Sequence, residues 1–451
     1  MRGFLASSIG VTCAAALTLP LTLPTAAHAA KPAAQESVPG TTQSLPLTPL
    51  TTPGDGTRSA APRQQRREQG LPRRDVRPFS LVGVVWDDPD AQLHGQVQVR
   101  TRTTGTSTWS TWQDVETHSD DAPDPDTAEH ASRTLRGATA PLWVGDSDGV
   151  EVRVKAEEPP AGARAAAPGT EPLPKGLRLE LVDPGAEPPA AGAEAAGPRG
   201  AVLTPETAAA SAVNADLAPL GASVIPALTK KESEDDLIAA RGADDAKARP
   251  YVGPRPRIIT RKGWGADEKL RERQFGYTKT VKAAFVHHSA SGNNYRCSQA
   301  SSVIRSIYRY HVKSSGWRDI GYNFLVDKCG NIYEGRAGGV TKPVMGAHTL
   351  GFNTNSTGIA VLGTFGSSTP PAAAVNAIAR LTAWKLGLYG ANPRGTTYLK
   401  SGGGNLYKKG KNVRLKVISG HRDGFATECP GRRLYKKLGT ARSSSARLQG
   451  R

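Results

Sequence analysis

Long hydrophobic runs are scarce in this chain of 451 residues. The main apolar stretch runs from about Ile9 to Leu23, and it is too short and too interrupted by proline to span a bilayer. A basic Arg2 before it and the small-residue sequence AAHAA after it are typical of a secretory signal peptide over residues 1–30. No other segment is apolar enough to cross a membrane. The sequence therefore predicts an exported protein with no membrane span.

Cysteine is also scarce, with four residues in the chain, one of them inside the expected signal peptide. The three that remain are an odd number, so in an oxidising compartment one is unpaired or takes part in chemistry. If Cys429 is a zinc thiolate, Cys297 and Cys329 are left as a natural disulfide pair. The alternative is that Cys429 is a spare buried thiol, which would leave an exported protein with an oxidisable group.

Acidic residues are few in the C-terminal part of the chain. Residues 251–451 contain 34 Lys and Arg against 8 Asp and Glu, a net charge of +26, whereas the remainder contains 24 against 32, a net charge of −8. A strongly cationic exported domain should accumulate at polyanions, such as anionic wall polymers or membrane surfaces. Solubility alone is the alternative role of this charge. Export and the lack of a nucleic-acid-binding motif argue against nucleic acid as the partner.

Composition divides the N-terminal half into three segments after the signal peptide. Residues 31–76, rich in Pro, Thr, Ala and Gly and then in Arg and Gln, predict a disordered leader. Residues 77–184 contain short alternating runs, such as FSLVGVVW and VEVRVKA, which predict a small all-β, sandwich-like module without a catalytic constellation. The tryptophans of its WSTW run either pack an edge or stack on a sugar. Residues 185–256 predict an Ala, Pro and Gly-rich linker with one short helix at about 230–241.

Strand and helix patterns alternate from residue 257 to residue 440, which predicts an α/β domain with a mixed sheet flanked by helices. The expected strands include VKAAFVHHS, a hairpin in GYNFLVDKCGNIYEGR, GIAVLGTF and VRLKVISGH. Residues 441–451 are expected to form a basic disordered tail. His287 and His421 both fall at the carboxyl ends of expected strands, where sites in open α/β sheets lie.

Two histidines and a cysteine carry the clearest chemical signal. His287 lies in FVHHSAS, and His421 and Cys429 lie together in GHRDGFATECPG. Imidazole nitrogen and thiolate sulfur are ligands that Zn²⁺ prefers, and three protein ligands with one open position are typical of a catalytic zinc. Water bound at the open position loses a proton near neutral pH and supplies a hydroxide nucleophile. His288 should point to the opposite face of its strand. These residues predict a zinc hydrolase.

Five motifs in order, TRKGWGADE, FVHHSAS, GWRDIGYNFLVDKCGNIYEGRAGG, MGAHTLGFNTNSTGIAVLGTF and GHRDGFATECPG, carry a family resemblance. The domain over residues 257–440 resembles peptidoglycan recognition proteins and zinc-dependent N-acetylmuramoyl-L-alanine amidases. The resemblance covers less than half of the chain. It implies a Zn²⁺ held by His287, His421 and Cys429, and Cys429 is the ligand that the non-catalytic recognition members lack. It also favours an extracellular disulfide between Cys297 and Cys329.

The resemblance also implies roles for residues around the metal. Tyr322 falls at the position of the catalytic tyrosine, and Thr427 falls two residues before the cysteine ligand, where family members hold a lysine or threonine. His348 is a candidate for contact with the substrate, as are Asn353 and Trp317. The alternatives are a turn-forming role for Asn353 and a packing role for Trp317. The role of the glycine-rich, basic insertion at about 392–411 stays open.

The function that follows is hydrolysis of the amide bond between N-acetylmuramic acid and L-alanine of peptidoglycan stem peptides. Cell-wall remodelling or lysis by a secreted, wall-associated monomer would be the consequence. The alternative is a recognition protein that binds peptidoglycan without cleaving it. A third possibility is zinc-dependent hydrolysis of another amide.

Overall fold

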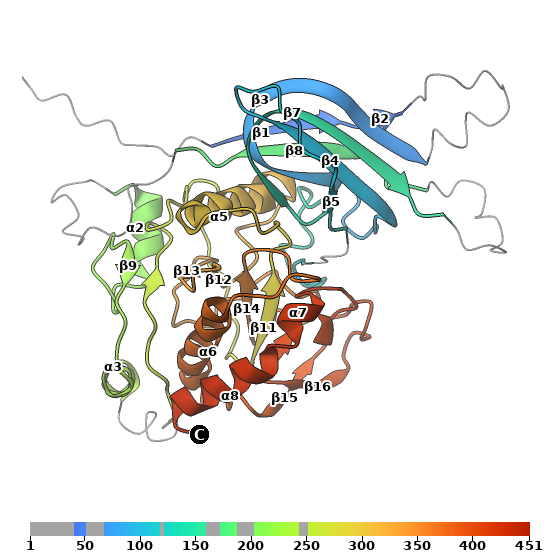
Figure 1. Cartoon of the computed structure of the whole chain (residues 1–451). Helices are drawn as coiled ribbons and strands as arrows, with labels where there is room; N and C mark the ends of the chain where they lie inside the picture. Colours follow the sequence, from blue (N-terminus) through green and yellow to red (C-terminus); the bar gives the residue numbers. More distant parts are fainter. Residues whose placement is uncertain (1–39, 51–66, 118–120, 159–171, 187–202, 243–250) are drawn as a thin grey trace, which may run out of the picture. The chain divides into compact units, whose positions relative to one another are not determined.

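The computed structural model describes residues 40–50, 67–117, 121–158, 172–186, 203–242 and 251–451 (Figure 1). The expected signal peptide, residues 1–30, lies outside the described residues. Within the described ranges, every helix is too short or too polar to cross a bilayer.

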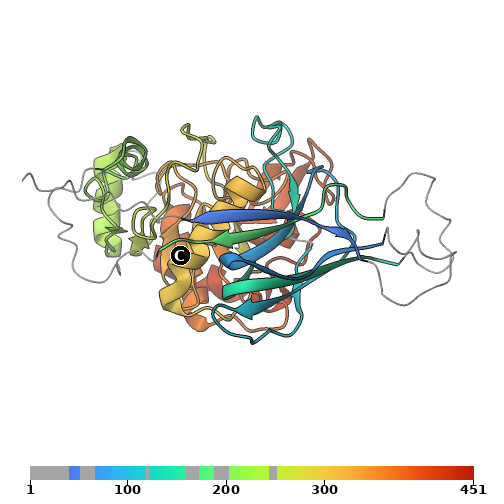
Figure 2. The ribbon, with the colours of Figure 1, turned by 90° about the horizontal axis from the view of Figure 1, so that it is seen from above.

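Eight strands of the N-terminal half form one antiparallel sheet, with the order β1-β8-β3-β7-β4-β5 and with β2 and β6 paired to β3. Figure 2 shows its blue and green strands side by side. The all-β class of this module is confirmed. The strands are β1 (Thr41–Pro46), β2 (Thr48–Pro49), β3 (Glu68–Trp86), β4 (Gly95–Thr103), β5 (Gln113–Val115), β6 (Gly137–Ala138), β7 (Leu142–Ala156) and β8 (Arg178–Asp183).

The sheet begins earlier in the chain than the composition indicates. β1, β2 and the first part of β3 lie within residues 31–76, which were expected to be a disordered leader, so that expectation is wrong for the described part. The six residues of β1 pair with β8, which lies far from β1 along the chain. Because the partner strand supplies the backbone hydrogen bonds, a polar and proline-containing segment is ordered that could not form a core by itself.

Seven strands of the C-terminal domain form a mixed sheet with the order β17-β11-β14-β12-β13-β10-β9. β11 is parallel to β14 and to β17, and β12 forms an antiparallel hairpin with β13. The α/β class with a mixed sheet is thereby confirmed. The strands are β9 (Val224–Ile225), β10 (Ile258–Ile259), β11 (Ala283–His288), β12 (Phe324–Val326), β13 (Ile332–Glu334), β14 (Ser356–Val361) and β17 (Ile418–Gly420).

The VRLKVISGH segment forms two strands where one was expected. β16 (Asn412–Lys416) pairs with β15 (Thr396–Lys400) in a separate two-stranded sheet, and β17 joins the main sheet. β15 is part of the basic insertion at about 392–411. Val417 lies between the two strands, and its amide bonds to the carbonyl of Gly395.

Two helices, α6 (Ala372–Gly387) and α8 (Leu438–Gln449), lie side by side on one face of the mixed sheet (Figure 1). Residues 441–451 were expected to be a disordered tail, but most of them belong to α8, so that expectation is wrong. Small buried residues of α8, such as Ala441 and Ala446, allow close packing on α6 despite the polar sequence. Thr382 donates a hydrogen bond to Ser445 across the helix pair.

The expected linker, residues 185–256, also contains regular structure. The helix expected at about 230–241 is α3 (Lys230–Arg241), which begins with a capping box formed by Thr229 and Glu232. The linker further contains α2 (Pro205–Ala212) and β9, which pairs with β10 of the main sheet. The described part of residues 185–256 is therefore not a continuous linker, and that expectation is wrong.

One hydrophobic core is shared between the two sheets. It joins Leu81 and Val85 of β3 to residues of α5 (Ala300–Arg309) and to Leu325 and Ala360 of the mixed sheet. The alternate residues of β3, Val82, Val84 and Trp86, belong to the module's own core, as the two-residue period of a strand requires.

Tyr310, in the short π-helix η2 (Tyr310–Ser314) after α5, completes this junction. Its hydroxyl donates to the carbonyl of Thr139 at 3.1 Å. Gly83 of β3 allows the close approach, because a Cβ at this position would lie 2.3 Å from the Tyr310 hydroxyl. The remaining short elements are η1 (Cys297–Gln299), η3 (His421–Asp423) and α7 (Arg432–Tyr435).

Candidate metal centre

Parallel strands bring the two predicted histidine ligands together. His287 is the penultimate residue of β11, and His421 follows directly after β17, which is the parallel neighbour of β11. Their ring centroids lie 4.5 Å apart. Cys429 is presented by the loop between η3 and α7, and its Sγ lies 3.7 Å from His287 Nδ1. All three side chains are buried.

The ligand atoms of His287, His421 and Cys429 all lie within 4.8 Å of one another. Thr349 Oγ1 is 3.3 Å from His287 Nε2, on the side of the ring away from the cysteine, and so it orients the imidazole. Neither ring nitrogen of His421 has a hydrogen-bond partner among the described residues, although both are buried. Buried nitrogens without partners are costly in an apolar interior, and a cation held between the three side chains would satisfy them.

Burial sets the protonation of these ligands. It lowers the pKa of His287 to about 3, with a smaller contribution from His288, and it lowers the pKa of His421 well below its ordinary value. Both imidazoles are therefore neutral and able to donate a lone pair to a metal. Burial raises the pKa of the Cys429 thiol, which a bound cation would reverse by favouring the thiolate. Two imidazoles and one thiolate at this spacing fit Zn²⁺.

Tyr322 lies at this centre, two residues before β12. Its ring centroid is 5.6 Å from that of His287, and the side chain is buried. Burial and the neighbouring Asp121 carboxylate raise the pKa of Tyr322 well above its ordinary value, so the phenol stays protonated. Thr427 lies beside the cysteine, and its Oγ1 accepts a hydrogen bond from the Cys429 amide at 3.2 Å.

The three residues predicted to contact substrate have different surroundings. His348 is buried with its ring centroid 5.2 Å from that of His287. Asn353 accepts hydrogen bonds from the His348 and Thr349 amides through its Oδ1, so it holds a turn. Trp317 stacks on His311 at a centroid distance of 4.2 Å. Substrate contact by any of them stays a prediction.

An acidic segment that the sequence analysis did not single out covers the centre. We use this name for Glu116–Glu129, which follows β5 of the N-terminal sheet and whose described residues are 116, 117 and 121–129. Asp121 Oδ1 lies 3.0 Å from His287 Nδ1 and 3.4 Å from His421 Nδ1. Asp121 Oδ2 accepts a 2.6 Å hydrogen bond from the Tyr322 hydroxyl. Burial raises the pKa of Asp121 to about 6.

Further side chains fix the acidic segment to the C-terminal domain. Asp124 Oδ1 accepts hydrogen bonds from Asn353 Nδ2 at 2.7 Å and from the Gly351 amide at 2.8 Å. Glu129 forms a buried, bidentate ion pair with Arg336, with N–O distances of 2.8 and 2.9 Å. Burial alone would raise the pKa of Glu129, but the charge and hydrogen bonds of Arg336 lower it.

A charge signal for the acidic segment is present in the sequence. Its fourteen residues contain six Asp and Glu and no Lys or Arg, whereas residues 251–451 carry a net charge of +26. This contrast predicts an electrostatic contact between the two parts of the chain. It does not predict which carboxylate reaches the metal centre, because that depends on how the sheets pack.

His288 points away from the three ligands, as expected. Its Nδ1 accepts a hydrogen bond from the Phe365 amide at 3.2 Å, and its Nε2 lies 3.3 Å from a carboxylate oxygen of Glu116. Glu116 is the first residue of the acidic segment. His288 therefore fixes the end of β11 and the start of this segment to each other.

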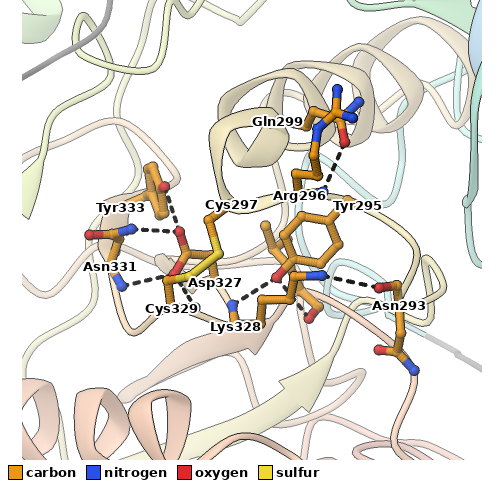
Figure 3. Close-up of a disulfide and its surroundings, with 11 residues drawn as sticks. Asn293, Tyr295, Arg296, Cys297, Gln299, Asp327, Lys328, Cys329, Asn331 and Tyr333 are labelled. Carbon is orange, nitrogen blue, oxygen red and sulfur yellow. Dashed lines mark hydrogen bonds between the residues drawn. A yellow bond between two sulfur atoms is a disulfide. The ribbon is translucent and has the colours of Figure 1, made fainter.

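The disulfide expected between Cys297 and Cys329 is confirmed (Figure 3). It joins the start of η1 to the turn between β12 and β13. Asp327 organises that turn, because its Oδ1 accepts hydrogen bonds from the Cys329 and Asn331 amides, each at 2.9 Å. The hydroxyl of Tyr333 donates to the other carboxylate oxygen at 2.9 Å. The disulfide lies in the hairpin that follows Tyr322.

Arginine side chains stack on the two tryptophan rings of the WSTW run. The guanidinium carbon of Arg73 lies 5.1 Å from the ring centroid of Trp109, and that of Arg153 lies 4.2 Å from that of Trp112. Arg100 lies 4.8 Å from the centroid of Trp112. These cation–π contacts favour the packing interpretation over the sugar-stacking one.

Comparison with known proteins relates both halves of the chain to described families. The family described as Rv3811 N-terminal galactose-binding domain-like matches residues 29–174, and the family described as N-acetylmuramoyl-L-alanine amidase matches residues 277–432. Peptidoglycan-recognition protein SC2 of Drosophila simulans is 30% identical over 185 residues, 41% of this chain and 85% of its own length. Peptidoglycan-recognition protein SC1a of Drosophila melanogaster is 31% identical over 188 residues, which are 42% of this chain and 87% of its own length. The solved structure of Drosophila PGRP-LB aligns with 41% of this chain and 92% of its own, at 26% identity and a TM-score of 0.32.

Proposed function

The chain belongs to the family of peptidoglycan recognition proteins and N-acetylmuramoyl-L-alanine amidases, and on that premise we propose that it is an exported, zinc-dependent amidase. The bond cleaved is the amide between the lactyl group of N-acetylmuramic acid and the first L-alanine of the stem peptide. The curated relatives are peptidoglycan-recognition proteins by name, which supports peptidoglycan as the partner. The net charge of +26 on residues 251–451 supports retention at anionic wall polymers.

One observation carries the proposal: the ligand atoms of two neutral imidazoles and a thiol lie within 4.8 Å of one another, and neither ring nitrogen of His421 has a hydrogen-bond partner in the described part of the chain. A buried cluster of this kind is unstable as a simple core, because it leaves polar atoms unsatisfied. Zn²⁺ bound by these residues would polarise an amide carbonyl and lower the pKa of a bound water. Three protein ligands leave the coordination position that such chemistry requires.

The chain's own residues supply the rest of the chemistry. Tyr322 keeps its proton because its pKa is raised, so its phenol is a hydrogen-bond donor toward a substrate oxygen that gains negative charge. The same phenol can pass its proton to the leaving amine and take up in return the proton that the attacking water releases. Thr427 lies next to Cys429 and is the second donor that we propose for this oxygen. Thr349 holds the His287 ring in the orientation that directs Nδ1 toward Cys429, and these two residues with His421 would hold the cation.

The competing function is recognition of peptidoglycan without cleavage. Asp121 lies beside both histidines, where it would restrict access to the centre, and that would fit a protein that does not cleave. The same segment also engages Asn353 and Arg336, so it would obstruct binding as well as cleavage. Obstruction therefore does not favour the recognition protein over the enzyme. The presence of Cys429 beside two histidines favours the enzyme.

The experiment that tests the proposal combines metal analysis with product analysis. The purified full chain and its Asp121→Ala variant would be incubated with peptidoglycan, with and without a zinc chelator, and soluble products analysed by mass spectrometry. We expect one equivalent of zinc and free stem peptides that begin with L-alanine, lost on chelation and restored by zinc. Wall binding by both proteins without such peptides would assign the chain to the recognition class.

A further inference from the structure

We infer that residues Asp121–Glu129 of the acidic segment are a built-in inhibitor of the metal centre, and that Asp121 supplies a fourth protein ligand where a catalytic site would keep an open position. The inference rests on the proposed zinc site and adds a regulation to it. A site closed by four protein ligands is typical of structural zinc and cannot activate water. With the acidic segment docked, the enzyme is therefore latent.

The distances around the centre support this assignment. In a tetrahedral site with metal–nitrogen and metal–oxygen distances of about 2.0–2.1 Å, neighbouring ligand atoms lie roughly 3.3 Å apart, and a thiolate lies roughly 3.6 Å from a nitrogen. Asp121 Oδ1 lies 3.0 Å from His287 Nδ1 and 3.4 Å from His421 Nδ1. Cys429 Sγ lies 3.7 Å from His287 Nδ1. The carboxylate oxygen thus has the spacing of a ligand.

Asp121 Oδ1 is itself an unsatisfied group. The side chain is 7% exposed, and Oδ1 has no hydrogen-bond partner among the described residues, while Oδ2 is bonded by Tyr322. Leaving a carboxylate oxygen buried without a partner costs free energy unless a cation is near. The atom without a hydrogen-bond partner is the one that faces both histidines, so a cation held at the same centre would satisfy it.

The acidic segment also engages further side chains of the C-terminal domain. The phenol of Tyr322 is engaged by Asp121, Asn353 is engaged by Asp124, and Arg336 is neutralised by Glu129. At the exposed edge, Lys409 of the basic insertion lies 2.8 Å from Asp126, but both side chains are exposed, so this ion pair contributes little to docking. The proposed proton donor, a polar side chain and a buried cation are thus all held by one segment of the same chain.

Release would be local and would not require the two sheets to separate. The shared core that includes Leu81, Val85 and Tyr310 holds the N-terminal sheet on the C-terminal domain. In contrast, residues 121–136 contain neither helix nor strand, so they can leave the site while β5 and β6 stay in place. The proposed inhibitor is therefore a loop without regular structure, attached to a fixed support.

The test uses the full chain loaded with Co²⁺, whose visible absorption reports its ligands, and azide as a small metal-binding probe. We compare the wild type with Asp121→Ala, and with Asp121→Asn in case the first variant folds poorly. The matched control is Asp126→Asn, which removes a charge from the same segment at a side chain that is 62% exposed. We expect azide to change the spectrum of the Asp121 variants and to leave the wild type and the control unchanged.

Activity gives a second readout. If the open form is a minor state of 0.1–10%, removal of the ligand should raise stem-peptide release by about tenfold or more, with the control equal to the wild type. Identical cobalt spectra and identical azide binding in the wild type and the Asp121 variants would overturn the inference. A spectral change with no stem peptides from any variant would support the fourth ligand and overturn the proposed amidase, so the two failures are distinguishable.

Discussion

Tyr322 and Asp121 are joined by a 2.6 Å hydrogen bond, although 201 residues separate them in the chain. The phenol is the donor, because burial and the carboxylate both raise its pKa. The bond places the proposed catalytic proton and the proposed inhibitory ligand on the same pair of side chains. A change at Tyr322 therefore affects both the chemistry and the docking of the acidic segment.

For this reason, the role of Tyr322 is best measured where Asp121 has already been replaced. In the Asp121→Ala background, we expect Tyr322→Phe to lower kcat by about 10²–10⁴-fold, which is the usual contribution of a positioned acid or base. The zinc content should not change, because the phenol is not a ligand. Steady-state kinetics on a soluble muramyl peptide, with zinc measured by atomic absorption, check this expectation.

The matched control for this experiment is Tyr277→Phe. Tyr277 is 48% exposed and donates a 2.9 Å hydrogen bond to the Gly338 carbonyl, so its loss should leave kcat unchanged. Full activity in the Tyr322 variant would instead mean that the ring only packs against His287.

Replacement of Cys429 should separate cleavage from wall binding. Cys429→Ala removes the sulfur ligand proposed for the centre, so we expect zinc stoichiometry to fall and hydrolysis to be lost. Sedimentation with purified cell walls should be largely retained, because the cationic surface remains, and should weaken as salt is raised. Loss of hydrolysis and wall binding together would show that zinc organises the fold.

The disulfide should stabilise the hairpin that follows Tyr322. Cys297 and Cys329 close a sequence separation of 32 residues, and the chain-entropy model gives a stabilisation of about 3–4 kcal/mol for such a loop. The double variant Cys297→Ser, Cys329→Ser should lower the free energy of unfolding by this amount in urea titrations. Reduction of the wild type should have the same effect. An unchanged urea midpoint in both cases would contradict the prediction.

The shared core predicts that the two halves unfold together. Gly83→Ala should destabilise the chain by about 1–3 kcal/mol, the usual cost of overpacking, because the new Cβ meets the Tyr310 hydroxyl. Differential scanning calorimetry should show one transition that moves as a whole. Gly366→Ala is the control, since its Cβ would meet nothing within 4 Å. Two transitions, with only one of them shifted, would mean that the halves are independent.

Much of the metal centre could be predicted from the sequence, because ligand chemistry is local. His287, His421 and Cys429 are identified by residue type and motif, and in the structure their ligand atoms lie within 4.8 Å of one another. α3 was expected at its observed position, where Thr229 and Glu232 form a capping box. These features depend on residues that are close in sequence or chemically distinctive.

The features that were missed depend on distant partners. β1 is ordered by β8, which begins 132 residues after the end of β1 (Pro46 to Arg178). α8 is ordered because Ala441 and Ala446 pack among the helices, which its polar sequence does not indicate. Asp121 reaches the histidines only because the shared core fixes one sheet on the other. None of these contacts has a local pattern.

Glu334 on β13 predicts a loss of stability with rising pH. Burial raises the pKa of Glu334 from 4.5 to about 7, against the opposing effects of Asn214 and Arg261. At pH values between 4.5 and about 7, Glu334 keeps its proton in the folded protein and loses it in the unfolded chain. The stabilisation is therefore complete below about pH 4.5 and is lost as the pH rises through 7. A pKa shift of this size corresponds to a change in the free energy of unfolding on the order of 3 kcal/mol.

Glu334→Gln removes this titration, so the urea midpoint of the variant should change less between pH 5 and pH 8 than that of the wild type. Its amide can still accept the hydrogen bond that Asn214 donates to Glu334. Glu428→Gln, at a side chain that is 75% exposed, is the matched control and should keep the wild-type pH dependence. If Glu334→Gln also keeps the full pH dependence, other buried groups cause it and Glu334 is ionised in the folded protein.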